Sequence, residues 1–182
     1  MQQAIITTHR LKLRLWHDAD VEPFVKLNMD GEVMRYFPAL QTKEESLAQI
    51  ARIKQHFTDY GYGLYAVERK DNGRFIGFTG FAHPRFESYF TPCVEIGWRL
   101  SKENWGQGFA TEAAIACVEY GLIELKLGEI YSWTATTNKP SINVMVKTGL
   151  KKIGEFEHPL LPDGHILKPH VLYKTEQNNL LS

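Results

Sequence analysis

Residues 95–113 read EIGWRLSKENWGQGFATEA, and this stretch decides the fold. The alternation in Val94 to Leu100 predicts a strand, and Phe109 to Glu124 predict a helix. Gly106 and Gly108 fall in the loop between them, where glycine lets the backbone turn tightly and approach a ligand. The first N–H groups of a helix have no partner within it, and the helix dipole favours negative charge there. The loop therefore suits a pyrophosphate.

The loop by itself leaves two interpretations open: an anion site, or a strand-to-helix turn that binds nothing. A P-loop is excluded because no Gly-Lys-Ser or Gly-Lys-Thr ends the segment. A dinucleotide-binding unit is disfavoured because the third glycine is missing and the strand follows a hairpin. The negative charge of Glu112 in the first turn of the helix is stabilised by the helix dipole, and we expect a structural role for Glu112.

A second informative segment is TATTNKPSINVMVKTGL at 134–150. A strand is expected to end at Ala135, and a short helix to start with proline near its first position. Asn138 and Ser141 are favoured capping residues, and Gly149 is a favoured helix stop. For each of these residues taken alone, a structural role is favoured over a functional one. A functional interpretation comes only from pairing this segment with the glycine loop.

The rest of the chain predicts further strands and helices in mixed order. Strands are expected at 11–15, 64–68, 75–81, 129–135, 151–156 and 170–174. Helices are expected behind Asp18 or Asp20 and behind Thr42. About seven strands and four helices predict one α/β (α+β) domain over 1–182, with a core of about 8–175 and a tail at 176–182.

Composition narrows the class of protein. The 182 residues include 21 Lys+Arg and 21 Asp+Glu, and 43% are hydrophobic, which is ordinary for a globular protein. Zero net charge argues against a protein built mainly to hold nucleic acid or an anionic membrane. Cys93 and Cys117 have no metal-type spacing, and the N-terminus lacks an apolar signal core. A cytoplasmic protein with reduced thiols is expected.

Together the two segments resemble the coenzyme-A-binding core of the GNAT superfamily of N-acetyltransferases. The similarity is greatest to the branch of ribosomal-protein-alanine N-acetyltransferases. It rests on EIGW at 95–98, WGQGFATEA at 105–113, and NKPSIN with KTGL between 138 and 150. Weaker matches are THRLKLR at 8–14 and GYGLYAV at 61–67.

The resemblance implies a GNAT-like sheet that splays open at its centre between two parallel strands. Acetyl-CoA would lie in the gap as co-substrate, without a metal. The strand at 94–100 would pair its backbone with the pantetheine arm, and the loop would hold the pyrophosphate through backbone N–H groups. The implied donor-binding residues are Trp98, Arg99, Leu100, Gly106, Gln107, Gly108, Phe109, Ala110, Thr111, Asn138, Ser141 and Asn143.

The reaction that the resemblance implies is direct attack by a neutral amine on the acetyl carbonyl. Glu95 is the candidate base, since on its strand it shares a face with Gly97 and Arg99 and could face the gap. An ordinary ion pair across the sheet is an equally open interpretation of Glu95.

Two positions depart from the wider family. The tyrosine that usually protonates the thiolate is missing, because Met145 occupies its place. A serine at the position of Ser141 serves instead in the resembled branch, so Ser141 is the candidate acid and Tyr131 a weaker one. Glu103 stands where Gln or Arg is common, and we expect it to point away from phosphate charge.

The expected acceptor is a primary amine, either a protein N-terminus or a small molecule. We expect a monomer or homodimer with no nucleic-acid or membrane partner. His158, His165 and His170 are expected to line the acceptor end or to lie in a loop, rather than to bind metal. One rival is a non-catalytic acyl-CoA-binding module, supported only by Met145. A further rival is a nucleotide-binding protein of another fold.

Overall fold

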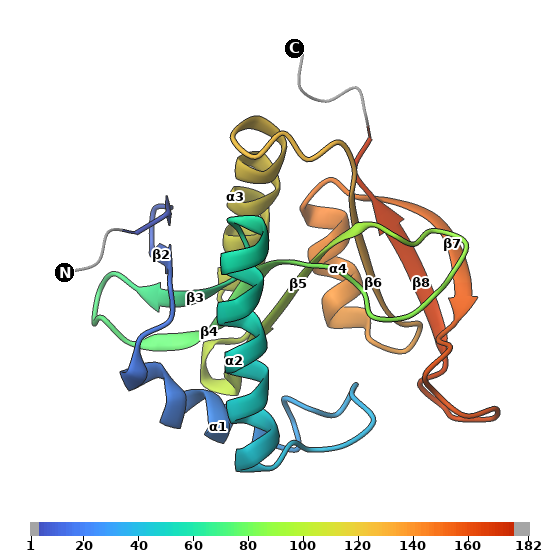
Figure 1. Cartoon of the computed structure of the whole chain (residues 1–182), viewed down its shortest axis with the longest axis horizontal. Coiled ribbons are helices and arrows are strands. Elements are labelled where there is room, and N and C mark those ends of the chain that lie inside the picture. The colour runs from blue at the N-terminus through green and yellow to red at the C-terminus, as the bar shows by residue number, and fades with distance from the viewer. Residues whose placement is uncertain (1–3, 177–182) are drawn as a thin grey trace.

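The strand predicted at 94–100 is present with the same bounds, as β5 (Val94–Leu100). A computed structural model describes residues 4–176, in which eight strands form one mixed sheet with helices on both faces (Figure 1). The other strands are β1 (Ile6–Thr7), β2 (Leu11–Arg14), β3 (Leu64–Arg69), β4 (Phe75–Ala82), β6 (Ile130–Ala135), β7 (Lys151–Glu157) and β8 (Pro169–Lys174). The helices are α1 (Val21–Met29), α2 (Lys43–Tyr60), α3 (Phe109–Ile123) and α4 (Lys139–Lys147), with 3₁₀ turns at Asp18–Asp20 and Lys102–Asn104.

The sheet has the order β1-β2-β3-β4-β5-β6-β8-β7. Its neighbouring strands are antiparallel except for β5 and β6, which are parallel. The β5–β6 pairing is confined to Val94 with Ile130 and Glu95 with Tyr131, although β5 continues to Leu100. The expected splay between two central parallel strands is therefore confirmed.

Short-range sequence patterns, such as capping residues, predicted most of the helices and strands. Thr42 caps α2, because its side chain accepts from Glu45 N–H while the Glu45 carboxylate accepts from Thr42 N–H. Gly149 follows α4 with a left-handed φ of 85°. About seven strands were expected. The eighth is β1, which at two residues is too short for a visible alternation.

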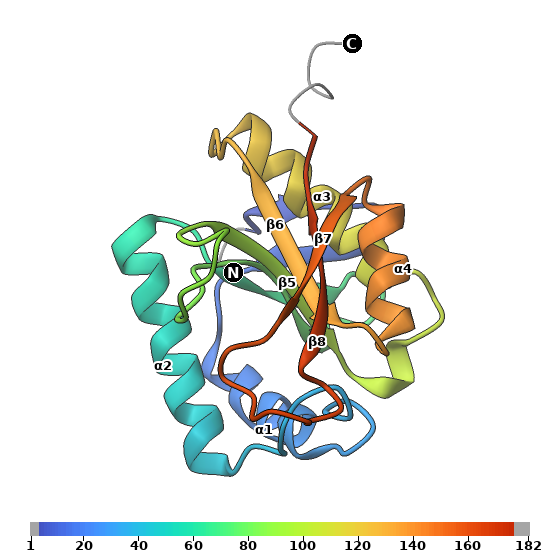
Figure 2. The ribbon, with the colours of Figure 1, turned by 90° about the vertical axis from the view of Figure 1, so that its right-hand side faces the viewer.

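Two hydrophobic clusters lie on opposite faces of the sheet. The larger one joins Ile96 of β5 to Ala113 and Cys117 of α3. The smaller one joins Phe24 of α1 and Ile50 of α2 to the other face. Figure 2 shows α2 and α4 on opposite sides of the central strands. Successive side chains of β5 therefore point alternately to the α3 side and to the α1 and α2 side of the sheet. This alternation determines which side chains of β5 can take part in the site.

None of the helices within residues 4–176 combines the length and the apolar character needed to cross a bilayer.

Candidate active site

A cavity of about 720 Å³ lies where β5 and β6 diverge. Its walls include β5, the loop before α3, the first turns of α3 and α4, and the segment between α1 and α2. The candidate residues that line it are Glu95, Trp98, Arg99, Leu100, Gly106, Gly108, Phe109, Ala110, Thr111, Asn138, Ser141 and Asn143. Two segments that are separate in the sequence thus meet at one cavity.

The backbone of β5 presents alternate residues to this gap. Ser101 N–H donates to the Ile76 carbonyl of β4 at 2.9 Å, so the odd-numbered residues belong to the ladder with β4. On the other side, the Ile96 carbonyl accepts from Ser132 Oγ of β6 at 2.9 Å. The N–H and C=O of Trp98 therefore point into the gap, beyond the last β5–β6 pair. Pairing of this backbone with a pantetheine arm stays a prediction.

Arg99 lies differently from the other donor candidates on β5. Its backbone stands opposite Phe78 in the β4 ladder, so strand alternation turns it away from the gap. Its side chain lies on the α1 side of the sheet, where Nη1 donates to Asn28 Oδ1 at 2.6 Å. The Arg99 backbone therefore pairs with β4, and a contact of Arg99 with the donor stays a prediction.

The glycine loop has the geometry that its sequence predicts. Gly106 and Gly108 have φ values of 70° and 80°, a left-handed conformation that favours glycine. Gly108 is the residue before α3, so the free N–H groups of that helix open at the cavity. Glu103 is exposed and outside the lining, in agreement with the expectation that it points away. Gln107 also falls outside the lining.

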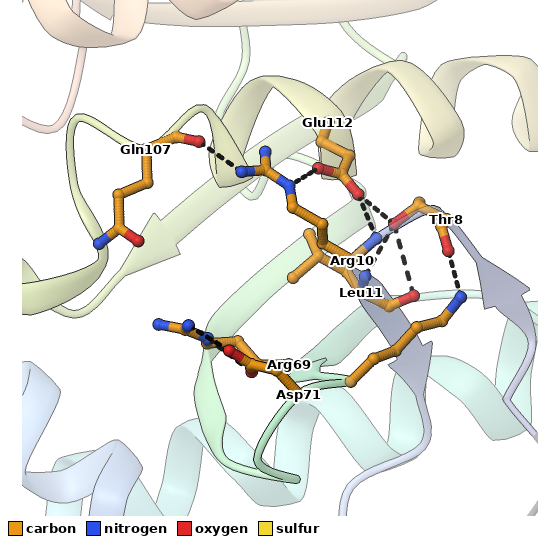
Figure 3. Close-up of polar contacts among 8 residues, drawn as sticks. Thr8, Arg10, Leu11, Arg69, Asp71, Gln107 and Glu112 are labelled. Atoms are coloured by element: carbon orange, nitrogen blue, oxygen red, sulfur yellow. Dashed lines mark hydrogen bonds and ion pairs between the residues drawn. The ribbon is translucent and has the colours of Figure 1, made fainter.

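The Glu112 carboxylate ties the N-terminal segment to this loop (Figure 3). It accepts from Thr8 Oγ1 at 2.6 Å, from Arg10 N–H at 2.8 Å and from Arg10 Nε at 2.6 Å. Arg10 also donates from Nη1 to the Gln107 carbonyl at 2.9 Å and lies over the Phe109 ring. Burial alone would raise the pKa of Glu112, but these hydrogen bonds and the Arg10 charge lower it. Glu112 is structural, as expected.

The role of Arg10 was missed from the sequence. The only signal for it was the weak match at 8–14. A contact between residues about 100 positions apart leaves no local pattern.

Replacing Glu112 with alanine is expected to cost about 1–2 kcal/mol, because several hydrogen bonds to a charged acceptor are lost. That lowers the melting temperature by roughly 2–8 °C for a domain of this size. Acetyl-CoA binding is expected to weaken as well, since Arg10 loses the anchor that holds it at the loop. Thermal melts and calorimetric titration measure the two effects.

The control for this variant is Glu22→Ala, which breaks an exposed pair with Lys26 on α1. An exposed pair contributes little, so its melting temperature and acetyl-CoA affinity should equal those of the parent. Equal changes in the two variants would contradict the role of Glu112.

Glu95 lies on the cavity wall, opposite Ala82 of β4. Burial raises the pKa of its carboxyl to about 8, and no neighbouring charge contributes to that shift. Within residues 4–176 the alternative of an ion pair across the sheet is therefore not realised. Next to it on the same face, Gly97 has open space where a side chain would stand. A carboxyl of raised pKa beside open space suits a base that works near neutral pH.

Ser141 lies in the first turn of α4 on the same cavity. Asn138 caps that helix, because its Oδ1 accepts from Ser141 N–H at 3.3 Å while its Nδ2 donates to Thr134 Oγ1 at 2.8 Å. The Tyr131 hydroxyl donates to Glu129 at 2.7 Å, and Tyr131 is not among the lining residues. Of the two candidate acids, only Ser141 faces the cavity.

Two histidines line one end of the cavity. The His158 and His170 rings are 4.9 Å apart, and Phe86 of the β4–β5 loop packs on His158. Burial, with the neighbouring His170 adding to it, lowers the pKa of His158 to about 4, and burial also lowers the pKa of His170. Both rings are therefore neutral at pH 7. His165 does not line the cavity. In the described chain no three His, Cys, Asp or Glu side chains are grouped to hold a metal ion.

Comparisons with known proteins agree with this geometry. The family model of an acetyltransferase (GNAT) domain matches residues 10–151. Uncharacterized protein YkkB of Bacillus subtilis (strain 168) is 31% identical over 159 residues, which cover 85% of this chain and 91% of the relative. A solved acetyltransferase (GNAT family) from Bacillus anthracis is 25% identical with a TM-score of 0.77, covering 94% of this chain and 98% of that one. Ribosomal-protein-S5-alanine acetyltransferase from Vibrio fischeri has the same fold, with a TM-score of 0.76 at 17% identity and coverage of 97% and 98%.

Proposed function

The chain belongs to the GNAT acetyltransferase family, which transfers acetyl groups from acetyl-CoA, and we propose that it acetylates a primary amine by direct attack in a ternary complex. One observation carries the proposal. A single cavity joins the glycine loop at the start of α3, the Trp98 backbone that β6 leaves unpaired, and the half-buried Glu95, whose carboxyl has a raised pKa.

Acetyl-CoA fits the groups that line this cavity. The backbone N–H groups that follow Gly108 suit the pyrophosphate, since the α3 dipole adds favourable charge there. The Trp98 N–H and C=O suit the amides of the pantetheine arm, because β6 does not pair with them. When bound, acetyl-CoA supplies an activated acetyl carbonyl.

The side chains would then move two protons. Glu95 takes a proton from the attacking amine as the new C–N bond forms. The C–S bond breaks, and Ser141 gives its hydroxyl proton to the departing thiolate. Solvent then returns a proton to Ser141 and takes the one held by Glu95, which restores both side chains. Holding amine and donor together in one cavity makes the attack effectively unimolecular.

Binding and turnover test the proposal separately. Isothermal titration should give micromolar binding of acetyl-CoA, with no binding of ATP or NAD. Thiol release from acetyl-CoA should then depend on an added amine. Binding without release for any amine would identify the rival, a non-catalytic acyl-CoA-binding module. Tighter binding of ATP or NAD would indicate a nucleotide-binding protein instead.

Replacing Ser141 with alanine is expected to lower kcat by about 100-fold, the low end of the contribution of a general acid, because the thiolate loses its proton donor. The KM for acetyl-CoA should stay nearly constant, since Asn138 still caps α4 through the Ser141 backbone. Ser141→Thr retains the hydroxyl and should restore most of the rate. Full turnover by the alanine variant would remove Ser141 from the mechanism.

A further inference from the structure

Arg99 carries a buried charge that the proposed reaction does not use. The residue is only 8% exposed and lines the cavity. Within residues 4–176, the hydrogen bond from Nη1 to Asn28 Oδ1 is the only one its guanidinium makes. Its Nε is sealed from solvent and has no partner in the described chain. A sealed and unpaired donor is costly to a fold, so its retention needs a reason.

Arg14 shows how this protein treats a buried arginine that is purely structural. It is 5% exposed, much like Arg99. Its guanidinium donates to both carboxylate oxygens of Asp20, at 2.7 and 2.9 Å, and from Nε to Glu68 at 2.7 Å. It also donates to the Leu15 carbonyl at 3.1 Å. Two carboxylates thus compensate Arg14, whereas none in residues 4–176 pairs with Arg99.

Arg99 remains charged, and its surroundings favour an anion. Burial lowers its pKa to about 10, which keeps the guanidinium protonated at pH 7. The rings of Phe37 and Phe78 lie 4.0 and 5.4 Å from its Cζ, so its faces meet aromatic carbon. Nη1 donates to Asn28 and Nε is sealed, whereas Nη2 has no acceptor from the described chain and is not sealed. Nη2 is therefore the donor that a carboxylate oxygen in the cavity can reach.

The other charges around the cavity do not neutralise Arg99. Arg35 lines the same cavity and stacks on Tyr36, which adds a second cation. Glu32 also lines it, and the Glu32 carboxylate lies 3.8 Å from Lys102 Nζ. The part of the cavity near α1 is therefore positive.

Strand geometry relates Arg99 to the proposed base. Glu95, Gly97 and Arg99 share one face of β5, and four residues of strand separate the Glu95 and Arg99 backbones by about 13 Å. The long arginine side chain can shorten the distance between the two functional groups. Gly97 between them leaves open space. One small molecule can therefore span the two side chains.

We propose that Arg99 binds a carboxylate carried by the acceptor, so that the substrate is an amine with a carboxylate a few bonds away. This inference rests on the proposed acetyl transfer, since it names the class of amine that reaches Glu95. The uncompensated guanidinium fixes one end of the acceptor, and the amine at the other end meets the acetyl carbonyl. Arg99 is thus a specificity-determining residue, and polyamines are disfavoured as acceptors.

Matched acceptors test the inference. Each of the twenty amino acids, β-alanine and γ-aminobutyrate is assayed beside its carboxamide, with spermidine as a polycation. The best carboxylate acceptor should exceed its carboxamide in kcat/KM by about 10- to 100-fold, the contribution of a hydrogen bond between charged groups. In Arg99→Gln that ratio should fall to near one, through a higher KM for the carboxylate, and Arg99→Lys should keep part of it.

Stability separates this role from a structural one. Arg99→Gln removes a buried charge that no carboxylate in residues 4–176 compensates, so it should change the melting temperature by less than about 3 °C. Arg14→Gln leaves the buried carboxylate of Asp20 without its cation and should lower the melting temperature by roughly 10 °C. A large loss of stability in Arg99→Gln, with the acceptor ratio preserved, would overturn the inference.

A binding measurement keeps the inference testable without turnover. Glutarate and glutaramide are titrated into the CoA-loaded protein, and glutarate alone should bind the parent but not Arg99→Gln. Glutarate binding without acetylation of any amine would overturn only the acetyl transfer. Acetylation with equal rates on carboxylates and carboxamides would overturn only the role of Arg99. Neither binding nor turnover would overturn both.

Discussion

Replacing Glu95 with glutamine is expected to lower kcat/KM for amine acetylation by about 10²- to 10⁴-fold, the usual contribution of a general base. Glutamine has nearly the same shape and cannot accept the proton. Burial raises the pKa of the Glu95 carboxyl to about 8, so the base is fully active only above that pH. The loss should therefore be greatest in alkaline solution.

The measurement is the ratio of parent to variant kcat/KM across pH 6 to about 9.5, a range chosen to bracket the raised pKa. The ionisation of the acceptor amine affects both proteins equally and cancels in the ratio. We expect the ratio to rise with pH and to level off above about 8. A flat ratio close to one would remove Glu95 from the mechanism.

Stability serves as the control for this variant. Between the ordinary pKa of 4.5 and about 8, the unfolded chain has lost the Glu95 proton while the folded protein retains it. The unfolded state then binds fewer protons, so the free energy of unfolding of the parent falls as pH rises through this window. Glutamine does not titrate. At pH 9 the variant should be at least as stable as the parent, which would exclude unfolding as the cause of lost activity.

Replacing Gly108 with tryptophan is expected to weaken acetyl-CoA binding by at least about 100-fold, or nearly 3 kcal/mol. Gly108 has a left-handed φ of 80° and stands where the cavity meets the first N–H groups of α3. A large side chain there would fill the space of the pyrophosphate. It would also strain the backbone, because non-glycine residues rarely adopt this φ.

The matched control is Gly61→Trp. Gly61 also has a left-handed φ, of 76°, is exposed at the end of α2, and does not line the cavity. It should show a similar loss of stability with unchanged acetyl-CoA affinity in calorimetric titration. Unchanged affinity in Gly108→Trp would place the donor elsewhere and would remove the support for the site at β5.

The sequence predicted the local backbone of the glycine loop and of the α4 cap well. Gly106 and Gly108 take left-handed φ values, as a tight strand-to-helix turn requires. Asn138 caps α4, as its residue type favours. Backbone conformation at turns and caps depends on neighbouring residues, and therefore one sequence is enough to predict it.

The sequence was less informative wherever residues from distant elements meet. Strand alternation predicted that Glu95 and Arg99 share one face. No local pattern showed that Arg14 would pair with two carboxylates while Arg99, within residues 4–176, would pair with none. Tyr131 was an open candidate until its hydroxyl proved to donate to Glu129. The hydrogen-bond partner of a side chain and its burial depend on the elements that pack against it. Its charge state depends on both.

The sequence predicted the order of strands and helices and the tight glycine loop, because these follow from short-range pattern and turn chemistry, and its two motif segments carried the resemblance to the family. Only the tertiary structure showed at which residue the two central strands part, that burial raises the pKa of the Glu95 carboxyl to about 8, and that Arg99 faces the cavity without a carboxylate among residues 4–176. The physical reason is desolvation. The free energy of a charged group depends on whether distant segments exclude water from it and on which groups they bring in exchange.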